Sequence, residues 1–393
     1  MTIFGARCAA EQPGATRGWH SSRNTALCCA AVLLVTACPM DCTDPASPPA
    51  AAGRVLWGTP LPAHTGVAGL VAVTPGGIYA ATDTGLSALD PATGALRWFV
   101  PATGMGGSRR MEVRNSRVFT AGTYAVRAHD VATGAVLWEN TYDPASADLG
   151  GVSADDQAVF VGLRDGRVLA LAQSDGHVLW QVQIATPEWQ FRGDIAGTTV
   201  SGDTLFVAAD RSLTENNFQS TVVVVALDRQ TGRELWRYQY AGTDMATNDP
   251  PALVGGKLVM TDVYAGYVLA LDAATGSQQW LQRVWGRIYS APAVRGDTVF
   301  VATAASRAYA LDAHTGRVLW TAITDGGAVG VAPCGTEVFV QNFHVEVRRA
   351  DNGHRVGIAF PNTYEEVATS GVTVAGRIAY VGTNKRLLAL RCE

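Results

Sequence analysis

Residues 296–320 are Gly296-Asp-Thr-Val-Phe-Val-Ala-Thr-Ala-Ala-Ser-Arg-Ala-Tyr-Ala-Leu-Asp-Ala-His-Thr-Gly-Arg-Val-Leu-Trp320. The stretch contains a glycine turn, an apolar segment, a short loop, a second segment that ends in Ala-Leu-Asp, a Thr-Gly turn and a third segment that ends in tryptophan. Glycine permits the positive φ of a tight turn, and the Asp and Thr side chains can hydrogen-bond the turn backbone. The stretch therefore predicts three short strands in succession.

The same pattern recurs along the chain, in Gly77–Trp98, Ser116–Trp138, Asp156–Trp180, Gly202–Trp236, Gly256–Trp280 and Gly335–Phe360. An eighth copy, Gly376–Leu390, stops before its last strand, and the missing piece stands at the other end as Gly53-Arg-Val-Leu-Trp57. The aromatic anchors of the repeats are Trp57, Trp98, Trp138, Trp180, Trp236, Trp280, Trp320 and Phe360.

A period of about 40–50 residues with four short strands per unit is typical of a β-propeller. Eight anchors predict an all-β, eight-bladed propeller over residues 53–393, with four-stranded blades. The N-terminal strand is expected to complete the last blade and close the ring, which leaves no free sheet edge at the seam.

The first 52 residues have a different composition. Residues 1–37 combine an arginine-bearing start with an apolar run too short to span a bilayer, as in a signal peptide. Val35-Thr36-Ala37-Cys38 resembles a bacterial lipobox, so we expect a lipoprotein signal peptide and lipidation at Cys38; the alternative is a plain secretory signal. Residues 38–52 are rich in proline and alanine and are expected to be a tether.

Composition and motifs argue against several functions. Of the 393 residues only 16% are charged and the formal net charge is −4, which removes the electrostatic reason for nucleic acid as the main partner. The histidines lack the spacing of a zinc-binding motif, and no Gly-x-Ser-x-Gly elbow occurs. We therefore predict no catalytic residues, no metal and no cofactor.

The departures from the repeat point to a binding surface. The longest anchor spacing, Trp180 to Trp236, contains a loop at 211–220 and a connector at 186–194. That connector places Trp189 and Phe191 beside Arg192, and aromatic residues with arginine are enriched in protein interfaces. The alternative is that the aromatic side chains plug the central funnel. Further candidates on connectors of the same face are Asp244, Asp249, Trp285, Arg287, Tyr289, Tyr364, Glu365 and Glu366.

The Ala-Leu-Asp-x-x-Thr-Gly-x-x-x-Trp unit resembles the repeat of the pyrroloquinoline-quinone-like propeller superfamily, which includes both enzymes and scaffolds. With eight blades and a lipobox, the chain is similar to the BamB family, the propeller lipoproteins of the outer-membrane β-barrel assembly machinery. That family has a Leu-x-Leu-Arg-Gly-Glu partner loop, and this chain has Trp189-Gln-Phe-Arg-Gly-Asp194. Asp244 and Asp249 are counterparts of two aspartates in the family's next connector, although they are spaced more widely.

The resemblance implies a non-catalytic scaffold, monomeric within a complex, that binds a barrel-assembly protein. It further implies a lipid anchor on the periplasmic side of the outer membrane. The alternatives are an extracytoplasmic sensor or ligand-binding propeller, and a quinoprotein enzyme. Quinoproteins of the superfamily use a disulfide between adjacent cysteines, and the one adjacent pair here, Cys28-Cys29, lies in the leader.

Three cysteines remain after the leader and the lipidated residue are set aside: Cys42, Cys334 and Cys392. A bridge between Cys42 and Cys392 would clasp the closure of the ring, and a bridge between Cys334 and Cys392 is the alternative.

Overall fold

The Asp-x-x-Thr-Gly turns connect the third and fourth strands of the repeat. Between β24 (Arg307–Asp312) and β25 (Val318–Ile323), Asp312 Oδ1 accepts hydrogen bonds from the backbone N–H and the hydroxyl of Thr315, both at 2.8 Å. Gly316 has a φ of +73°. Asp90, Asp130, Asp228 and Asp272 make the same pair of bonds to the threonine three residues later. These carboxylates therefore have a structural role, as their recurrence suggests.

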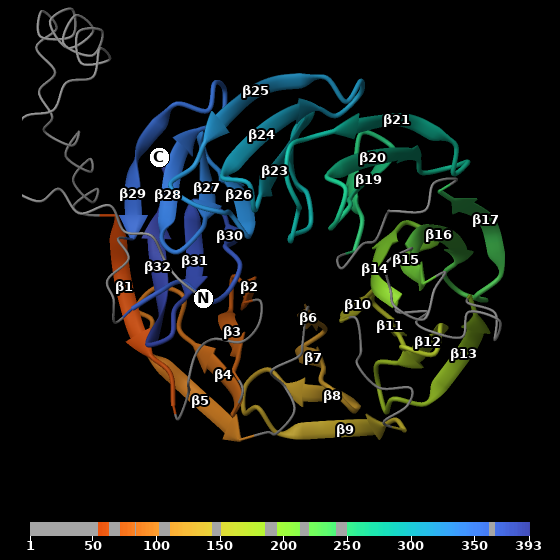
Figure 1. The fold of residues 1–393 in the computed structure, drawn as a ribbon. Helices are drawn as coiled ribbons and strands as arrows, with labels where there is room; N and C mark the ends of the chain where they lie inside the picture. The colour runs from red at the N-terminus through yellow and green to blue at the C-terminus, as the bar shows by residue number, and fades with distance from the viewer. Residues whose placement is uncertain are drawn as a thin grey trace, which may run out of the picture. The chain divides into compact units, whose positions relative to one another are not determined.

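The computed structural model describes residues 54–62, 71–82, 84–101, 111–143, 151–184, 195–212, 220–240, 250–360 and 366–393, which belong to one compact unit, 48–393. Their strands form eight four-stranded antiparallel sheets, the blades of an eight-bladed β-propeller (Figure 1). Seven blades use four consecutive strands, here named A to D from first to last.

The strands of blades 1 to 4 are β2 (Val71–Thr74), β3 (Gly77–Ala81), β4 (Gly85–Leu89), β5 (Leu96–Pro101), β6 (Met111–Arg114), β7 (Arg117–Ala121), β8 (Ala125–Asp130), β9 (Val136–Thr141), β10 (Val152–Ala154), β11 (Ala158–Gly162), β12 (Arg167–Ala172), β13 (Val178–Gln183), β14 (Ile195–Ser201), β15 (Thr204–Ser212), β16 (Ser220–Asp228) and β17 (Glu234–Gln239).

The strands of blades 5 to 8 are β18 (Ala252–Val254), β19 (Lys257–Thr261), β20 (Tyr267–Asp272), β21 (Gln278–Arg283), β22 (Ala293–Arg295), β23 (Thr298–Thr303), β24, β25, β26 (Gly330–Cys334), β27 (Glu337–Gln341), β28 (Val345–Arg349), β29 (Arg355–Phe360), β30 (Thr373–Ala375), β31 (Ile378–Gly382), β32 (Arg386–Arg391) and β1 (Val55–Pro60).

Each anchor tryptophan joins its blade to the next one. The indole of Trp280 in blade 5 donates to the carbonyl of Ala313 in blade 6 at 3.0 Å, and its ring covers Gly316. A Cβ at Gly316 would lie 2.7 Å from that ring, so the glycine is required by packing as well as by its positive φ. All seven tryptophans make this contact, and hydrophobic clusters fill the space between neighbouring blades.

Blade 8 is completed by the N-terminal strand, as the sequence predicts. β1 pairs with β32 in an antiparallel register that includes Trp57 opposite Ala389, and Figure 1 shows the first strand beside the last one. The Asp-x-x-Thr-Gly turn is missing here, because β1 and β32 are not consecutive strands and no turn connects them. Phe360, the anchor of blade 7, accordingly lacks a glycine turn to cover.

A disulfide and a buried ion pair take the place of that contact. Cys392 is bonded to Cys334, and Arg54 pairs with Glu337 at 2.6 Å, each side chain being less than 10% exposed. The preferred Cys42–Cys392 bridge is therefore wrong for this structure, and Cys42 lies outside the described residues. The reason is that the C-terminal residues lie on the β26–β27 turn of blade 7, where Thr336 N–H donates to the Glu393 carbonyl at 2.9 Å.

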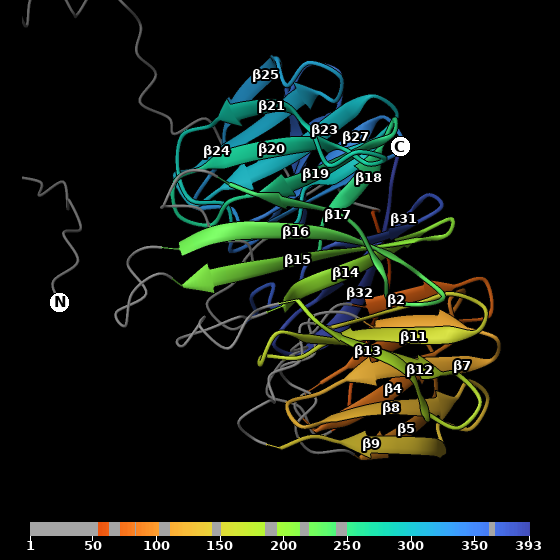
Figure 2. The same cartoon turned by 90° about the vertical axis from the view of Figure 1, so that its right-hand side faces the viewer.

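The insertion in blade 4 differs from its expected form. We expected a loop over 211–220, but β15 continues to Ser212 and β16 begins at Ser220, so the insertion lengthens a hairpin (Figure 2). Within it, residues 213–219 lie outside the described part of the chain.

Candidate functional site

Six of the eight predicted partner-binding residues lie outside the part of the chain that the structure describes. Trp189, Phe191, Arg192, Asp194, Asp244 and Asp249 lie outside the described residues, as do Cys38, Tyr364 and Glu365. Two of the predicted partner-binding residues, Trp285 and Arg287, are described. Both lie on the connector between β21 and β22, at the junction of blades 5 and 6.

This connector alternates between buried and exposed side chains. Val284 and Ile288 are buried among the apolar residues between blades 5 and 6, which fixes the connector to the propeller. The Trp285 side chain between them points outward and is 71% exposed, while its backbone N–H donates to the Tyr309 hydroxyl at 3.1 Å. Tyr289 is 43% exposed. Trp285 and Tyr289 therefore lie on the surface rather than filling the funnel.

Arg287 is held between two tyrosines. Its guanidinium carbon lies 5.7 Å from the ring centroid of Tyr264, a distance suited to a cation–π contact. A hydrogen bond with the Tyr289 side chain raises the pKa of Arg287 above its usual value, so the guanidinium stays charged. The connector thus presents a fixed positive charge beside an exposed indole.

Tyr264 belongs to a loop that is not among the sequence-predicted binding segments. It lies in the loop between strands B and C of blade 5 and is 53% exposed. This loop lies beside the connector, since Val284 N–H donates to the Gly266 carbonyl at 2.8 Å. In blade 7 the same loop carries Phe343, which is 64% exposed. A large aromatic residue in a loop of only a few residues is the sequence signal for both positions.

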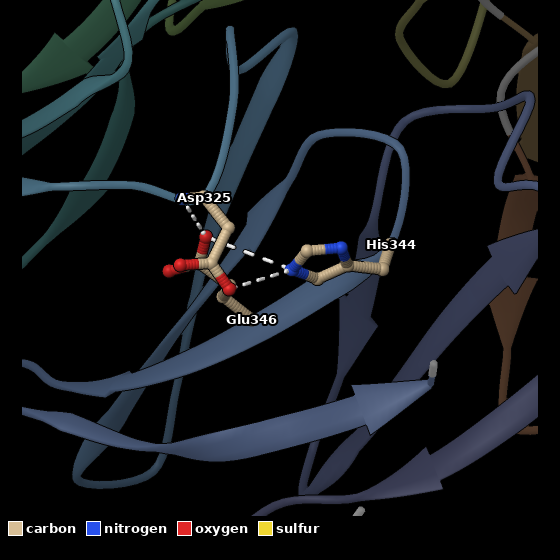
Figure 3. A group of neighbouring side chains, drawn as sticks. All are labelled: Asp325, His344 and Glu346. Atoms are coloured by element: carbon tan, nitrogen blue, oxygen red, sulfur yellow. Dashed lines mark hydrogen bonds and ion pairs between the residues drawn. The ribbon is translucent and has the colours of Figure 1, made fainter. Parts of the chain in front are cut away.

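Three ionisable groups, Asp325, His344 and Glu346, converge where the β27–β28 loop meets the β25–β26 connector (Figure 3). His344 Nε2 lies 3.3 Å from Asp325 Oδ2 and 3.7 Å from Glu346 Oε1. Asp325 comes from the β25–β26 connector, whereas Glu346 is on β28 and its side chain is fully buried. His344-Val-Glu346 does not have the spacing of a histidine-pair metal motif, and the third member, Asp325, comes from a distant connector, so no sequence motif marks this cluster.

The surroundings of this cluster favour an ion-pair network over a metal site. Imidazole and carboxylate are zinc ligands, and the separations would suit them. Arg348 Nη2, however, lies 2.8 Å from Glu346 Oε2, and both nitrogens of the Arg355 fork pair with Asp325. Two carboxylates are therefore balanced by two guanidiniums, which leaves no excess negative charge to hold a divalent cation.

The network ties the β25–β26 connector to the Phe343 loop. Glu346 Oε1 accepts from the Asp325 backbone N–H at 2.6 Å and from the Asn342 side chain at 2.8 Å. Burial would raise the pKa of Glu346, but the nearby His344 side chain, the hydrogen bond from the Asp325 backbone N–H and the charge of Arg348 lower it to about 2. Glu346 is thus ionised and positions the loop.

Glu366 does not belong to the exposed surface. It is buried, and its carboxylate accepts from Arg386 at 2.8 Å and from the Thr383 hydroxyl at 2.8 Å. Its partners are in blade 8, so Glu366 fixes the connector between β29 and β30 to that blade.

No helix in the described ranges is long and apolar enough to cross a membrane. A sequence model of the family described as outer membrane protein assembly factor BamB matches residues 47–221 and 219–390, which is nearly the whole propeller. An outer membrane protein assembly factor BamB of Shewanella oneidensis is 24% identical over 245 residues, covering 60% of this chain and 58% of that protein. The chain spans about half the length of the curated relatives it matches.

Solved structures share the fold. BamB from Moraxella catarrhalis has a TM-score of 0.66 at 17% identity, covering 86% of this chain and 99% of that one. Quinohemoprotein alcohol dehydrogenase from Comamonas testosteroni has a TM-score of 0.64 at 14% identity, covering 86% and 76%. Identities this low show a common architecture and leave the activity to be argued from the residues.

Proposed function

The chain belongs to the outer membrane protein assembly factor BamB family, and from this premise we propose that it is a lipid-anchored, non-catalytic scaffold in outer-membrane protein assembly. In this proposal Cys38 holds the protein at the periplasmic side of the outer membrane, and the tether over 38–52 lets the propeller reach its partner. The partner is the barrel-assembly protein, and the complex contains one copy of this chain.

The observation that carries the binding role is the connector between blades 5 and 6. It is fixed at Val284 and Ile288, while Trp285 and Arg287 project from the same face as the connectors of the other blades. Anchored aromatic and arginine side chains are the residues that dominate protein interfaces, and a rigid connector loses little entropy on binding. We propose that the 186–194 connector contributes Trp189, Phe191, Arg192 and Asp194, and that the next one contributes Asp244 and Asp249.

The test is binding of the purified full chain to the periplasmic part of the barrel-assembly protein from the same organism. Arg287→Glu and Arg192→Glu are each expected to weaken binding at least about tenfold, because each reverses a charge within the interface. Arg97→Glu is the control: Arg97 is an exposed arginine paired with Asp90 at the Asp-x-x-Thr-Gly turn of blade 1. Equal binding by all four proteins would refute the proposed role of these connectors.

The absence of catalysis is a separate part of the proposal and has its own test. The pure protein is mixed with pyrroloquinoline quinone and passed through a gel-filtration column. We expect the quinone absorbance to elute apart from the protein. Co-elution at a stoichiometric ratio would instead support a quinoprotein and overturn the scaffold proposal.

A further inference from the structure

Arginines at equivalent places in the blades differ in their partners. The third strand of blades 3, 6 and 8 begins with Arg167, Arg307 and Arg386 respectively. Arg167 pairs with Asp165 at 2.6 Å and Arg386 pairs with Glu366 at 2.8 Å. Arg307 has no carboxylate partner within the part of the chain that the structure describes, although it occupies the same position.

Two more arginines, at the end of blade 5 and on the connector that follows it, resemble Arg307 in this respect. Arg283, the last residue of β21, lies 5.8 Å from the Tyr267 ring centroid, just as Arg287 lies over Tyr264. Among the described residues neither arginine has a carboxylate partner. The face of blades 5 and 6 therefore carries three positive charges that the surrounding protein leaves unneutralised, whereas the nearby Asp325 is paired with Arg355.

The surface between these charges and Phe343 is continuous. Ala304 N–H donates to the Arg287 carbonyl at 2.8 Å, and Ala328 N–H donates to the Thr303 carbonyl at 2.9 Å. Gly326 then lies under the Phe343 ring, since a Cβ placed there would be 3.6 Å from it. Small residues occupy the middle of this surface, among them Ala304, Ala305, Gly326 and Gly327.

We propose that this blade 5–7 surface binds an apolar segment of the barrel-assembly protein that carries at least two carboxylates. We define the surface by Tyr264, Arg283, Trp285, Arg287, Arg307 and Phe343. The carboxylates pair with the three arginines, and apolar side chains contact Trp285 at one end and Phe343 at the other. The small residues between the two aromatic side chains allow the partner's backbone to approach closely.

The proposal rests on the proposed function for the identity of the partner, and it adds where the segment lies and what chemistry it has. A segment confined to the predicted connectors would need neither blade 7 nor Arg307. Because Glu346 fixes the Phe343 loop to the β25–β26 connector, both ends of the surface are in place before binding. Such preorganisation reduces the entropy lost on association.

The experiment measures the Kd of the full chain for the periplasmic part of the barrel-assembly protein, with variants and matched controls. Phe343→Ala is compared with Tyr124→Ala, which truncates a 52% exposed aromatic residue in the equivalent loop of blade 2. Arg307→Gln is compared with Arg167→Gln, which removes a paired arginine from the equivalent position of blade 3. Circular dichroism verifies that each variant is folded.

We expect Phe343→Ala and Arg307→Gln each to raise the Kd about five- to tenfold, with both controls within about twofold of wild type. The difference between the two arginine variants should shrink at high salt, because Coulomb attraction between exposed charges is screened. A photo-crosslinking amino acid at position 343 should join the barrel-assembly protein, whereas the same probe at position 124 should not.

The outcomes separate the two proposals. If wild type binds and Arg287→Glu weakens binding, while Phe343→Ala and Arg307→Gln behave like their controls, then the extended surface is wrong and the proposed function stands. If wild type does not bind the barrel-assembly protein, both proposals are wrong. Crosslinking from position 124 but not from 343 would also overturn the assignment of this surface.

Discussion

Replacing Trp280 by phenylalanine tests how the blades are held together. The substitution keeps an aromatic ring over Gly316 but removes the indole N–H, which donates to the Ala313 carbonyl at 3.0 Å. Both residues are buried, Trp280 being 8% and Ala313 1% exposed. Leaving a buried carbonyl without its partner costs about 1–3 kcal/mol, and the smaller ring also loses apolar contact area. We therefore expect a loss of about 2–3 kcal/mol in the free energy of unfolding.

The assay is equilibrium unfolding in urea, followed by far-ultraviolet circular dichroism so that the loss of a fluorophore does not matter. Trp285→Phe is the matched control, because that tryptophan is 71% exposed and the substitution leaves its backbone hydrogen bond to the Tyr309 hydroxyl in place. Its effect should stay within about 0.5 kcal/mol, as is usual for surface substitutions.

A second variant, Gly316→Ala, addresses the same contact from the other side. Its Cβ would lie 2.7 Å from the Trp280 ring at a φ of +73°, so it should destabilise as well. Because the two residues touch, the effects in the double variant should not add. Equal losses for Trp280→Phe and Trp285→Phe, or an unfolding free energy unchanged by Trp280→Phe, would refute the role that we assign to the anchors.

Two further predictions concern the seam and the charged network. The Cys334–Cys392 bridge closes a loop with a sequence separation of 58, which corresponds to about 4 kcal/mol in the chain-entropy model. A reductant should therefore lower the urea midpoint of the wild-type protein but not that of a Cys334→Ser/Cys392→Ser variant. Free thiols at both positions in the intact mass of the unreduced protein would contradict this prediction. Glu346 has a lowered folded-state pKa of about 2 against a usual 4.5, so its contribution is present above pH 4.5 and is lost as the pH falls towards 2. Glu346→Gln should therefore lower the free energy of unfolding at pH 7 and make that free energy fall less between pH 4.5 and 2. If the variant has the same free energy of unfolding as wild type at every pH, the network contributes nothing to stability.

The structure of the repeat could be predicted from the sequence, whereas the arrangement of side chains on the surface could not. The Asp312 turn and the Trp280 anchor were predictable because their chemistry is local and occurs many times, so that each copy supports the interpretation of the others. The Asp325–His344–Glu346 network was not predictable, since its members come from a connector, a loop and a strand that only folding brings together. The preferred disulfide was wrong for the same reason: proximity to the seam in sequence did not reveal that the C-terminus lies on blade 7.

The sequence by itself determined the propeller, the number of its blades and the completion of the last blade by the N-terminal strand. A period of about 40 residues with turn chemistry at fixed offsets admits few other folds, because each unit buries its apolar faces only against its neighbours. Only the tertiary structure decided which arginines stay unneutralised and which aromatic side chains remain exposed. Arg386 and Arg307 occupy the same position in the repeat, and what separates them is Glu366, a carboxylate twenty residues away that the fold brings to Arg386, whereas no described carboxylate pairs with Arg307.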